Sequence, residues 1–129
     1  MSNNRKVLFG QSIVEFAVVL PGMLMLIMGV LEIGRLFYIK VALQNAAREG
    51  AYYLSYYPDD FDGMKSAVAN EAISAGVELD PDTDIVLSHC CTRGEYVEVE
   101  VRQDDLSLLI FGFFTGNIDL SSKARMMVQ

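Results

Sequence analysis

An uncharged apolar run near the N-terminus constrains this chain more than any other feature. Residues 16–31 contain no charged side chain, and Glu15 directly precedes them. A helix rises about 1.5 Å per residue, so this run would cover roughly 24 Å of a hydrocarbon core that is about 30 Å thick. Adding residues 11–15 completes the span and places Glu15 near one end of it. Because a charge at the bilayer centre costs roughly 2.5–3.5 kcal/mol, a carboxylate within a span is by default a functional residue.

The charges on either side of the run predict its orientation. Arg5 and Lys6 precede it, and most of the carboxylates follow it. The positive-inside rule then places residues 1–10 in the cytoplasm and the rest of the chain outside the cytoplasmic (inner) membrane. A cleavable secretory signal would have a shorter apolar stretch and a small-residue cleavage site after it. The sequence instead predicts a single-pass membrane protein.

Helical spacing continues beyond the apolar run. One apolar stripe recurs at steps of three and four residues, as an amphipathic helix requires: Leu36, Ile39, Leu43, Ala46, Gly50, Tyr53 and Tyr57. The sequence therefore predicts one helix from about Ser12 to about Tyr57. Pro21 cannot donate to the carbonyl of Ala17, and Gly22 follows it, so we expect a kink or local melting there.

The second half of the chain is strongly acidic. The formal net charge is −7, and residues 58–105 hold thirteen of the seventeen carboxylates against three basic side chains. Binding to nucleic acid requires clustered lysine and arginine, so this function is excluded. The acidic part is predicted to be a solvated face or a surface for a cationic partner.

A turn separates the long helix from a second, shorter one. Pro58 disfavours helix at the residue before it, and several turn-forming residues follow. We expect Asp62 to cap a helix over residues 63–76. Its predicted apolar face is Met64, Ala67, Val68, Ala72 and Ala75.

Strand patterns follow this helix. Valines alternate with charged side chains over residues 95–102, which predicts a half-buried strand: Val97, Glu98, Val99, Glu100, Val101 and Arg102. Residues 84–91 and 118–128 also have strand patterns. The expected fold class is α+β, in which a long N-terminal transmembrane helix extends into a small head. The head would hold a second helix and about three antiparallel strands, laid against the C-terminal half of the long helix.

One apolar segment, LSLLIFGFF at residues 106–114, does not fit these elements. Nine residues are too few to span a bilayer as a helix. The segment either belongs to the core or forms an apolar loop that touches the membrane surface or a neighbouring subunit.

Signals for enzymatic or metal chemistry are weak. His89 and Cys90 are neighbours on a predicted strand, where adjacent side chains diverge. Cys90 and Cys91 lack the C-x-x-C spacing of zinc sites, and we expect buried thiols or, alternatively, a vicinal or intermolecular disulfide. Residues 80–84 alternate aspartates as calcium loops do, but Ile85 and Cys91 occupy the positions of the required glycine and glutamate. We therefore predict no metal, no cofactor and no enzymatic activity.

Four tyrosines gather near the end of the long helix: Tyr52, Tyr53, Tyr56 and Tyr57. Tyrosine combines a large apolar ring with a polar tip. We expect this cluster to join the helix to the sheet, with a role in adhesion as the alternative.

The N-terminal third resembles a known family. The segment GQSIVEFAVVLPGMLMLIMGVLEIGRLFYIKVALQNAAREGA, residues 10–51, is similar to the N-terminal signature of TadE-like proteins. These are minor pseudopilins of tight-adherence (Flp, type IVc) pilus systems. The spacing from Gly10 to Glu15, with Phe16 following, and the LQNAAREGA segment carry the resemblance.

The resemblance implies a processing site and an assembly residue. Residues 1–10 would be a prepilin-type leader, cut between Gly10 and Gln11 by a membrane prepilin peptidase. Residues 11–34 would span the membrane, residues 35–57 would continue the helix outside it, and residues 58–129 would form the acidic head. Glu15 would neutralise the new terminal amine of a neighbouring subunit. The implied partners are other pilin and pseudopilin subunits, the assembly platform in the membrane and the lipid bilayer.

Two other functions are compatible with the sequence. The first is a permanently anchored head that binds a ligand through its acidic face or its tyrosines, which predicts an uncut leader. The second is a membrane-tethered hydrolase or redox protein that uses His89 and Cys90, which predicts that Cys90→Ala abolishes activity.

Overall fold

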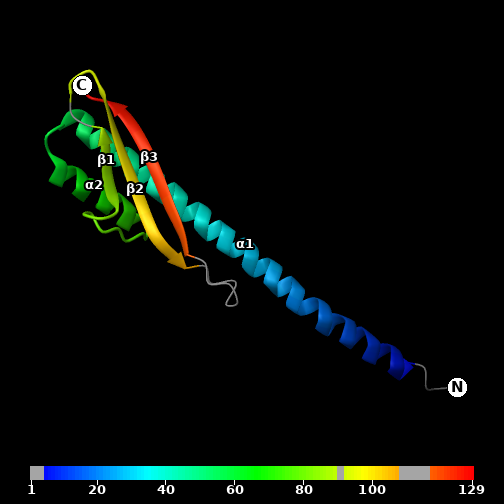
Figure 1. The fold of residues 1–129 in the computed structure, drawn as a ribbon. Coiled ribbons are helices and arrows are strands. Elements are labelled where there is room, and N and C mark those ends of the chain that lie inside the picture. The colour runs from blue at the N-terminus through cyan, green and yellow to red at the C-terminus, as the bar shows by residue number, and fades with distance from the viewer. Residues whose placement is uncertain (1–4, 90–91, 108–116) are drawn as a thin grey trace.

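The computed structural model describes residues 5–89, 92–107 and 117–129. The elements in chain order are α1 (Arg5–Tyr56), α2 (Phe61–Ser74), β1 (Ile85–His89), β2 (Tyr96–Ser107) and β3 (Asn117–Met127). In Figure 1, α1 is a long helix whose C-terminal part packs in a head made of α2 and the three strands. The remainder of α1 projects from this head. The predicted α+β fold is confirmed.

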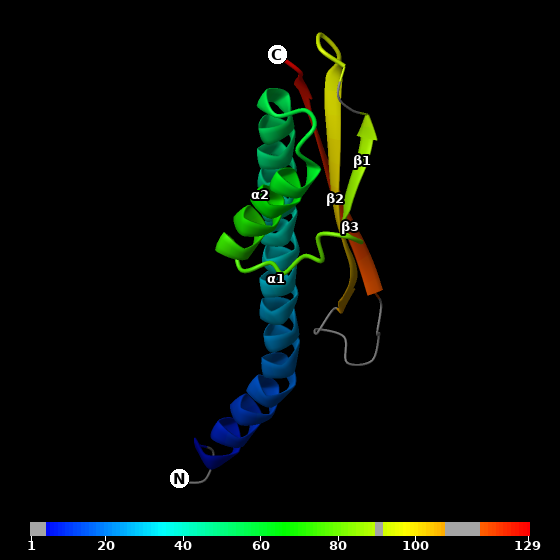
Figure 2. The same ribbon diagram turned by 90° about the vertical axis from the view of Figure 1, so that its left-hand side faces the viewer.

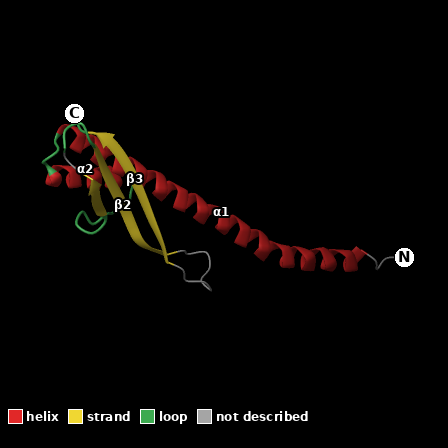
Figure 3. Cartoon of the chain, turned by 45° about the horizontal axis from the view of Figure 1, so that its top comes forward, coloured by secondary structure: helices red, strands yellow, loops and turns green. Residues whose placement is uncertain are grey.

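The helix α1 is longer at its start than the sequence suggested. It begins at Arg5 instead of Ser12 and ends at Tyr56, and it remains helical through Pro21. Local melting, one of the two outcomes expected at Pro21, does not occur. The N-terminal part of the helix, blue in Figure 2, bends away from the axis of the rest, and the same bend is seen in Figure 3. A proline loses one backbone hydrogen bond and crowds the preceding turn, which bends a helix without ending it.

The C-terminal half of α1 supplies one side of the core. The predicted stripe is correct from Ile39 to Gly50, whereas Leu36 and Tyr53 are half-buried and Tyr57 is exposed. Small residues widen the buried face, which lets α2 and the sheet approach the helix closely: Ala42, Ala46, Ala47 and Ala51. The helices form one layer and the sheet forms a second (Figure 2).

The cap of α2 differs from the prediction by two residues. Asp60 is the N-cap, and its Oδ1 accepts a hydrogen bond from the backbone N–H of Gly63 at 2.9 Å. Asp62, which was expected to be the cap, lies in the first turn, so that prediction is wrong. The reason is that Phe61 already has helical geometry, which makes Asp60 the last residue before the helix. Met64, Val68 and Ala72 are buried as expected.

The three strands form one antiparallel sheet in the order β1-β2-β3. The inner face of β2 is fully buried against α1, through Val97, Val99 and Val101. The sequence predicted that the outer face of β2 would be exposed. Glu98 and Glu100 on this face are instead buried. Because β2 is the central strand, side chains from both neighbouring strands can cover its polar face.

The structure describes only residues 106 and 107 of the apolar segment at residues 106–114. Strand β2 extends through Ser107, and Leu106 is buried in the core. The register between β2 and β3 shifts between Gln103 and Leu106, as a bulge produces. The rest of the segment lies outside the described residues, so its role as core or loop stays a prediction.

Candidate functional site

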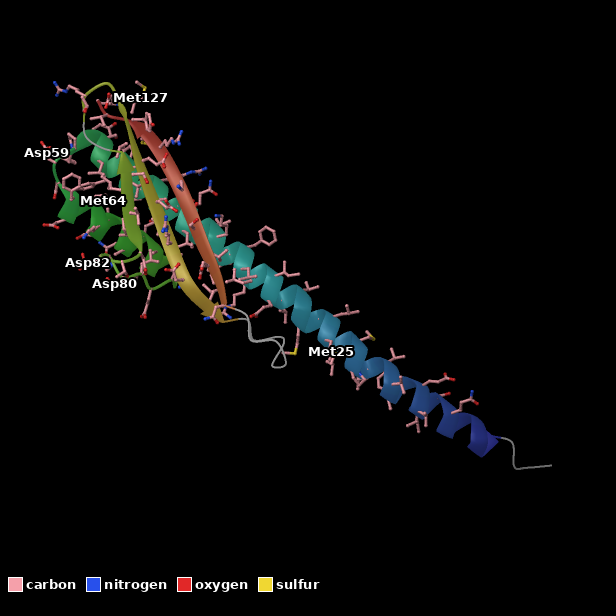
Figure 4. All side chains as sticks on the ribbon, in the orientation of Figure 1. Met25, Asp59, Met64, Asp80, Asp82 and Met127 are labelled. Atoms are coloured by element: carbon pink, nitrogen blue, oxygen red, sulfur yellow. The ribbon has the colours of Figure 1, made fainter. Side chains whose placement is uncertain are left out.

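The part of α1 that projects from the head exposes apolar side chains on all sides. Large apolar residues between Ile13 and Ile33 are 40–74% exposed. Within the part of the chain that the structure describes, α1 is the one helix long and apolar enough to cross a membrane, and none of its most apolar window, of mean hydropathy 2.3, is buried. Met25, labelled in Figure 4, lies on this projecting part, away from the head. A surface of this kind is not stable in water, which indicates single-pass anchoring in a bilayer.

The predicted processing and assembly residues lie together on the first turns of this helix. Gln11 and Glu15 are both exposed, and Gln11 Nε2 donates a hydrogen bond to Glu15 Oε1 at 3.3 Å. Nothing crowds Gly10, since a Cβ built on it would meet no atom within 4 Å. The Gly10–Gln11 peptide bond therefore lies on an open surface, four residues before the carboxylate.

A second group of polar contacts marks the other end of the projecting part. Glu32 and Arg35 form an ion pair at 3.5 Å, one turn apart. Directly after it, the Tyr38 hydroxyl donates to the carbonyl of Ala75 at 2.9 Å, and Lys40 Nζ contacts the carbonyl of Ser121. The contacts of Tyr38 and Lys40 attach α1 to the end of α2 and to β3, shortly after the uncharged run ends.

The outer face of the sheet carries a ladder of ion pairs. Glu100 accepts from Arg102 Nε at 2.9 Å and contacts Lys123 Nζ at 3.0 Å. The hydrogen bond from Arg102 lowers the pKa of Glu100 below its ordinary value, and the hydrogen bond from Lys123 lowers it further by a smaller amount. Arg125 contacts Glu98, and this ion pair raises the pKa of the guanidinium. The alternation of opposite charges at residues 98–102 and 123–125 was the available sequence signal for this ladder.

The tyrosine cluster is mostly a surface feature. Tyr53 donates to Asp60 Oδ2 at 2.7 Å, which raises the pKa of the phenol and lowers that of the carboxyl. It therefore joins α1 to the cap of α2. Tyr52 and Tyr56 form an edge-on pair at 5.1 Å, and with Tyr57 they are at least half exposed. Tyr53 also packs against the hydrophobic core, and the expectation that the cluster joins the helix to the sheet stays a prediction.

The aspartate-rich loop at residues 80–84 holds its own backbone. Asp84 Oδ2 accepts from the N–H of Asp80 at 2.9 Å, and Asp80 Oδ1 accepts from the N–H of Asp82 at 3.0 Å. Lys65 Nζ donates to Asp82 Oδ1 at 2.6 Å, which lowers the pKa of Asp82. Among the described residues, no group of three or more His, Cys, Asp or Glu side chains is arranged to hold a metal ion. The loop is a hydrogen-bonded acidic turn.

One cavity of about 590 Å³ lies where α1, the end of α2 and β2 meet. Its polar lining includes Arg35, Glu78 and Asp104. The buried Oε1 of Gln103, which also lines it, has no hydrogen-bond partner among the described groups. Of the pair proposed for enzymatic chemistry, the backbone of His89 pairs with Glu98 in the sheet, and Cys90 lies outside the described residues, as does Cys91.

Comparison with known proteins agrees with the resemblance at the N-terminus. The family model described as TadE-like protein matches residues 10–51. This segment covers the exposed apolar part of α1 and most of its buried part. No curated protein and no solved structure matched the chain. The match indicates a pilus-associated, minor pilin-like protein.

Proposed function

From the TadE-like match of residues 10–51, we propose that this chain is a minor pilin-like (pseudopilin) subunit of a tight-adherence (Flp, type IVc) pilus. It would be cut between Gly10 and Gln11 and would assemble through its apolar helix. The observation that carries the proposal is an apolar helix, exposed on all sides, with one carboxylate at its N-terminal boundary. The chain would cross the cytoplasmic membrane once, with residues 1–10 inside and the head outside.

Processing would change the charge at the membrane boundary. Hydrolysis of the Gly10–Gln11 bond releases Arg5 and Lys6 with the leader and leaves an ammonium group on Gln11. This group needs an anionic partner, because an unpaired charge in low dielectric is strongly unfavourable. Glu15 is the nearest carboxylate in sequence, and it is exposed, so the helix of another subunit can reach it.

The ammonium of one subunit and Glu15 of the next form the proposed contact. Within one chain, Gln11 and Glu15 already touch through the Gln11 side chain at 3.3 Å, so an intrachain pair competes with it. The contact between subunits has an additional effect, since it sets the axial register of two otherwise uniform apolar helices. The proposed partners are accordingly a prepilin peptidase, other pilin and pseudopilin subunits and the assembly platform.

Intact-mass measurement tests the processing step. Protein from its native host should lack residues 1–10 when the prepilin peptidase is present and retain them when it is deleted. A mature pool that still contains the leader would remove the processing proposal and favour a permanently anchored ligand-binding head.

Substitution of the carboxylate tests assembly. Glu15→Gln should leave processing and insertion intact but reduce photo-cross-linking to pilus subunits about tenfold or more, because the ammonium then remains unpaired. Glu32→Gln is the matched control, since Glu32 lies at the opposite end of the uncharged run and pairs with Arg35. Undiminished cross-links in Glu15→Gln would mean that the carboxylate is incidental.

A further inference from the structure

The cavity between α1, α2 and β2 lies at the end of the head from which α1 projects. Its walls include the residues that follow α2 and the last residues of β2, and both of these ends lie toward the projecting part of α1 (Figures 1 and 2). The part of α1 that lines the cavity runs from Arg35 to Ile39, a rise of about 6 Å directly after the expected membrane span of residues 11–34. The headgroup layer on each side of a bilayer is about 5–8 Å thick. The cavity therefore lies at the level of the lipid headgroups.

Gln103 is the unexpected residue in the wall of this cavity. It continues the inward alternation of Val97, Val99 and Val101 along β2, so a polar amide stands where the strand otherwise buries apolar side chains. Its buried Oε1 accepts no hydrogen bond from the described groups. An unpaired buried acceptor is destabilising. Gln103 therefore points to a ligand that donates a hydrogen bond into the cavity.

The charged groups in the wall define the ligand further. Glu78 and Asp104 bring two carboxylates to the cavity, and Arg35 brings one guanidinium. One guanidinium nitrogen of Arg35 pairs with Glu32 at 3.5 Å, which leaves other N–H donors for a ligand. A ligand that carries an ammonium group close to a phosphate matches both signs of charge. A purely anionic ligand would instead meet two carboxylates.

The remaining wall indicates that the ligand is amphiphilic. Apolar side chains line the cavity beside these polar groups: Ile39, Ile73, Val77 and Leu106. A small soluble zwitterion would leave this surface uncovered. A phospholipid can cover it with its glycerol and the first carbons of its acyl chains.

We propose that this cavity binds the headgroup of an ethanolamine phospholipid. The ammonium donates to Gln103 Oε1 and to the carboxylates of Glu78 and Asp104, and the phosphate accepts from Arg35. The proposal rests on the anchoring of α1 in a bilayer and goes beyond the pilus role. Since neither Gly10 nor Glu15 takes part, failure of processing or of charge pairing between subunits leaves it standing.

Native mass spectrometry of the full chain in detergent tests the choice of headgroup. The probes are dioleoylphosphatidylethanolamine, its N,N-dimethyl derivative and dioleoylphosphatidylcholine, which share acyl chains and phosphate but lose ammonium N–H donors step by step. Apparent affinity should fall about tenfold or more across this series, because Gln103 Oε1 loses its donor. Anionic dioleoylphosphatidylglycerol should bind about tenfold more weakly than the ethanolamine lipid. Equal binding of all four lipids would overturn the proposal.

Gln103→Met separates a binding role from a structural one. Methionine has a similar size and no strong acceptor, so affinity for the ethanolamine lipid should fall to that of the choline lipid. The melting temperature should stay the same or rise, because an unpaired buried acceptor is removed. A variant that unfolds more easily but keeps the lipid preference would show that Gln103 serves only the fold, and would overturn the proposal.

The carboxylates give a second test at exposed positions, where substitution should not impair folding. Glu78→Gln with Asp104→Asn should weaken binding of the ethanolamine lipid and strengthen binding of phosphatidylglycerol, since two negative charges leave the wall. The matched control is Glu49→Gln with Asp59→Asn, which removes two exposed carboxylates outside the cavity and should leave both affinities unchanged. Identical shifts in the variant and its control would mean that overall charge sets lipid binding, and the proposed site would be wrong.

Discussion

Replacing Gly50 with alanine perturbs the point where α1, α2 and β2 meet. Gly50 is buried, and a Cβ built on it would lie 2.5 Å from Val68 Cγ2, 3.3 Å from Val99 Cγ1 and 3.5 Å from Met64 Cγ. The first distance is far below van der Waals contact. Val68 is fully buried and β-branched, so its methyl group has little freedom to move.

Two opposing terms set the expected magnitude. In an unobstructed helix, replacing glycine with alanine stabilises the folded state by about 0.5–1 kcal/mol. Overpacking a tight core costs about 1–3 kcal/mol, and the short contact with a rigid neighbour places Gly50 in the upper part of that range. The net expectation is a loss of about 1–2 kcal/mol, or a melting temperature about 5–15 °C lower for a head of this size.

A double substitution separates overpacking from other causes. Val68→Ala alone should destabilise the head by about 2 kcal/mol, because it removes two buried methyl groups. In the double variant the new methyl at position 50 occupies the vacated space. The combined loss should therefore be about 1–2 kcal/mol smaller than the sum of the single losses.

Thermal unfolding of the full chain in detergent provides the assay. The chain contains no tryptophan, so the near-ultraviolet circular dichroism of its tyrosines reports the packing of the head. Gly34→Ala is the control, because a Cβ at Gly34 would meet no atom within 4 Å. Additive losses in the double variant, or a Gly50→Ala protein as stable as the unmodified chain, would refute the close approach of Gly50 to Val68.

Three further predictions concern the head. The pKa of Glu100 is lower in the folded state than in the unfolded chain. The carboxylate therefore stabilises the fold above its unfolded pKa of about 4.3, and this stabilisation is lost as the pH falls through its folded pKa. Between pH 6 and pH 3, the melting temperature should fall more in the unmodified chain than in Glu100→Gln. Asp60→Ala should lower the melting temperature, because it removes the cap of α2. Asp60→Asn should lower it much less, because asparagine can still accept a hydrogen bond from the N–H of Gly63. Asp59→Ala is the control. Cys90→Ala should leave pilus assembly unchanged, as measured by subunit cross-linking, and a loss of activity in that variant would favour the enzyme alternative.

The candidate site was accessible to sequence reasoning because it is local. Gly10, Gln11 and Glu15 lie within two turns of one helix, and their spacing determines their geometry once the helix is recognised. Their roles in processing and charge pairing stay predictions, since both depend on other chains. The ladder of Glu98 and Glu100 was missed because two of its three cations, Lys123 and Arg125, come from β3, more than twenty residues away in the chain.

The sequence by itself determined the long helix, its buried stripe and the buried valines of β2, because periods of about 3.6 and 2 residues are properties of the local backbone. Only the tertiary structure decided that β2 is the central strand, that two of its carboxylates are buried under cations and that Gly50 lies against α2 and the sheet. These features arise where elements distant in sequence come into contact. Local periodicity carries no information about which elements meet, so the packing alone could establish them.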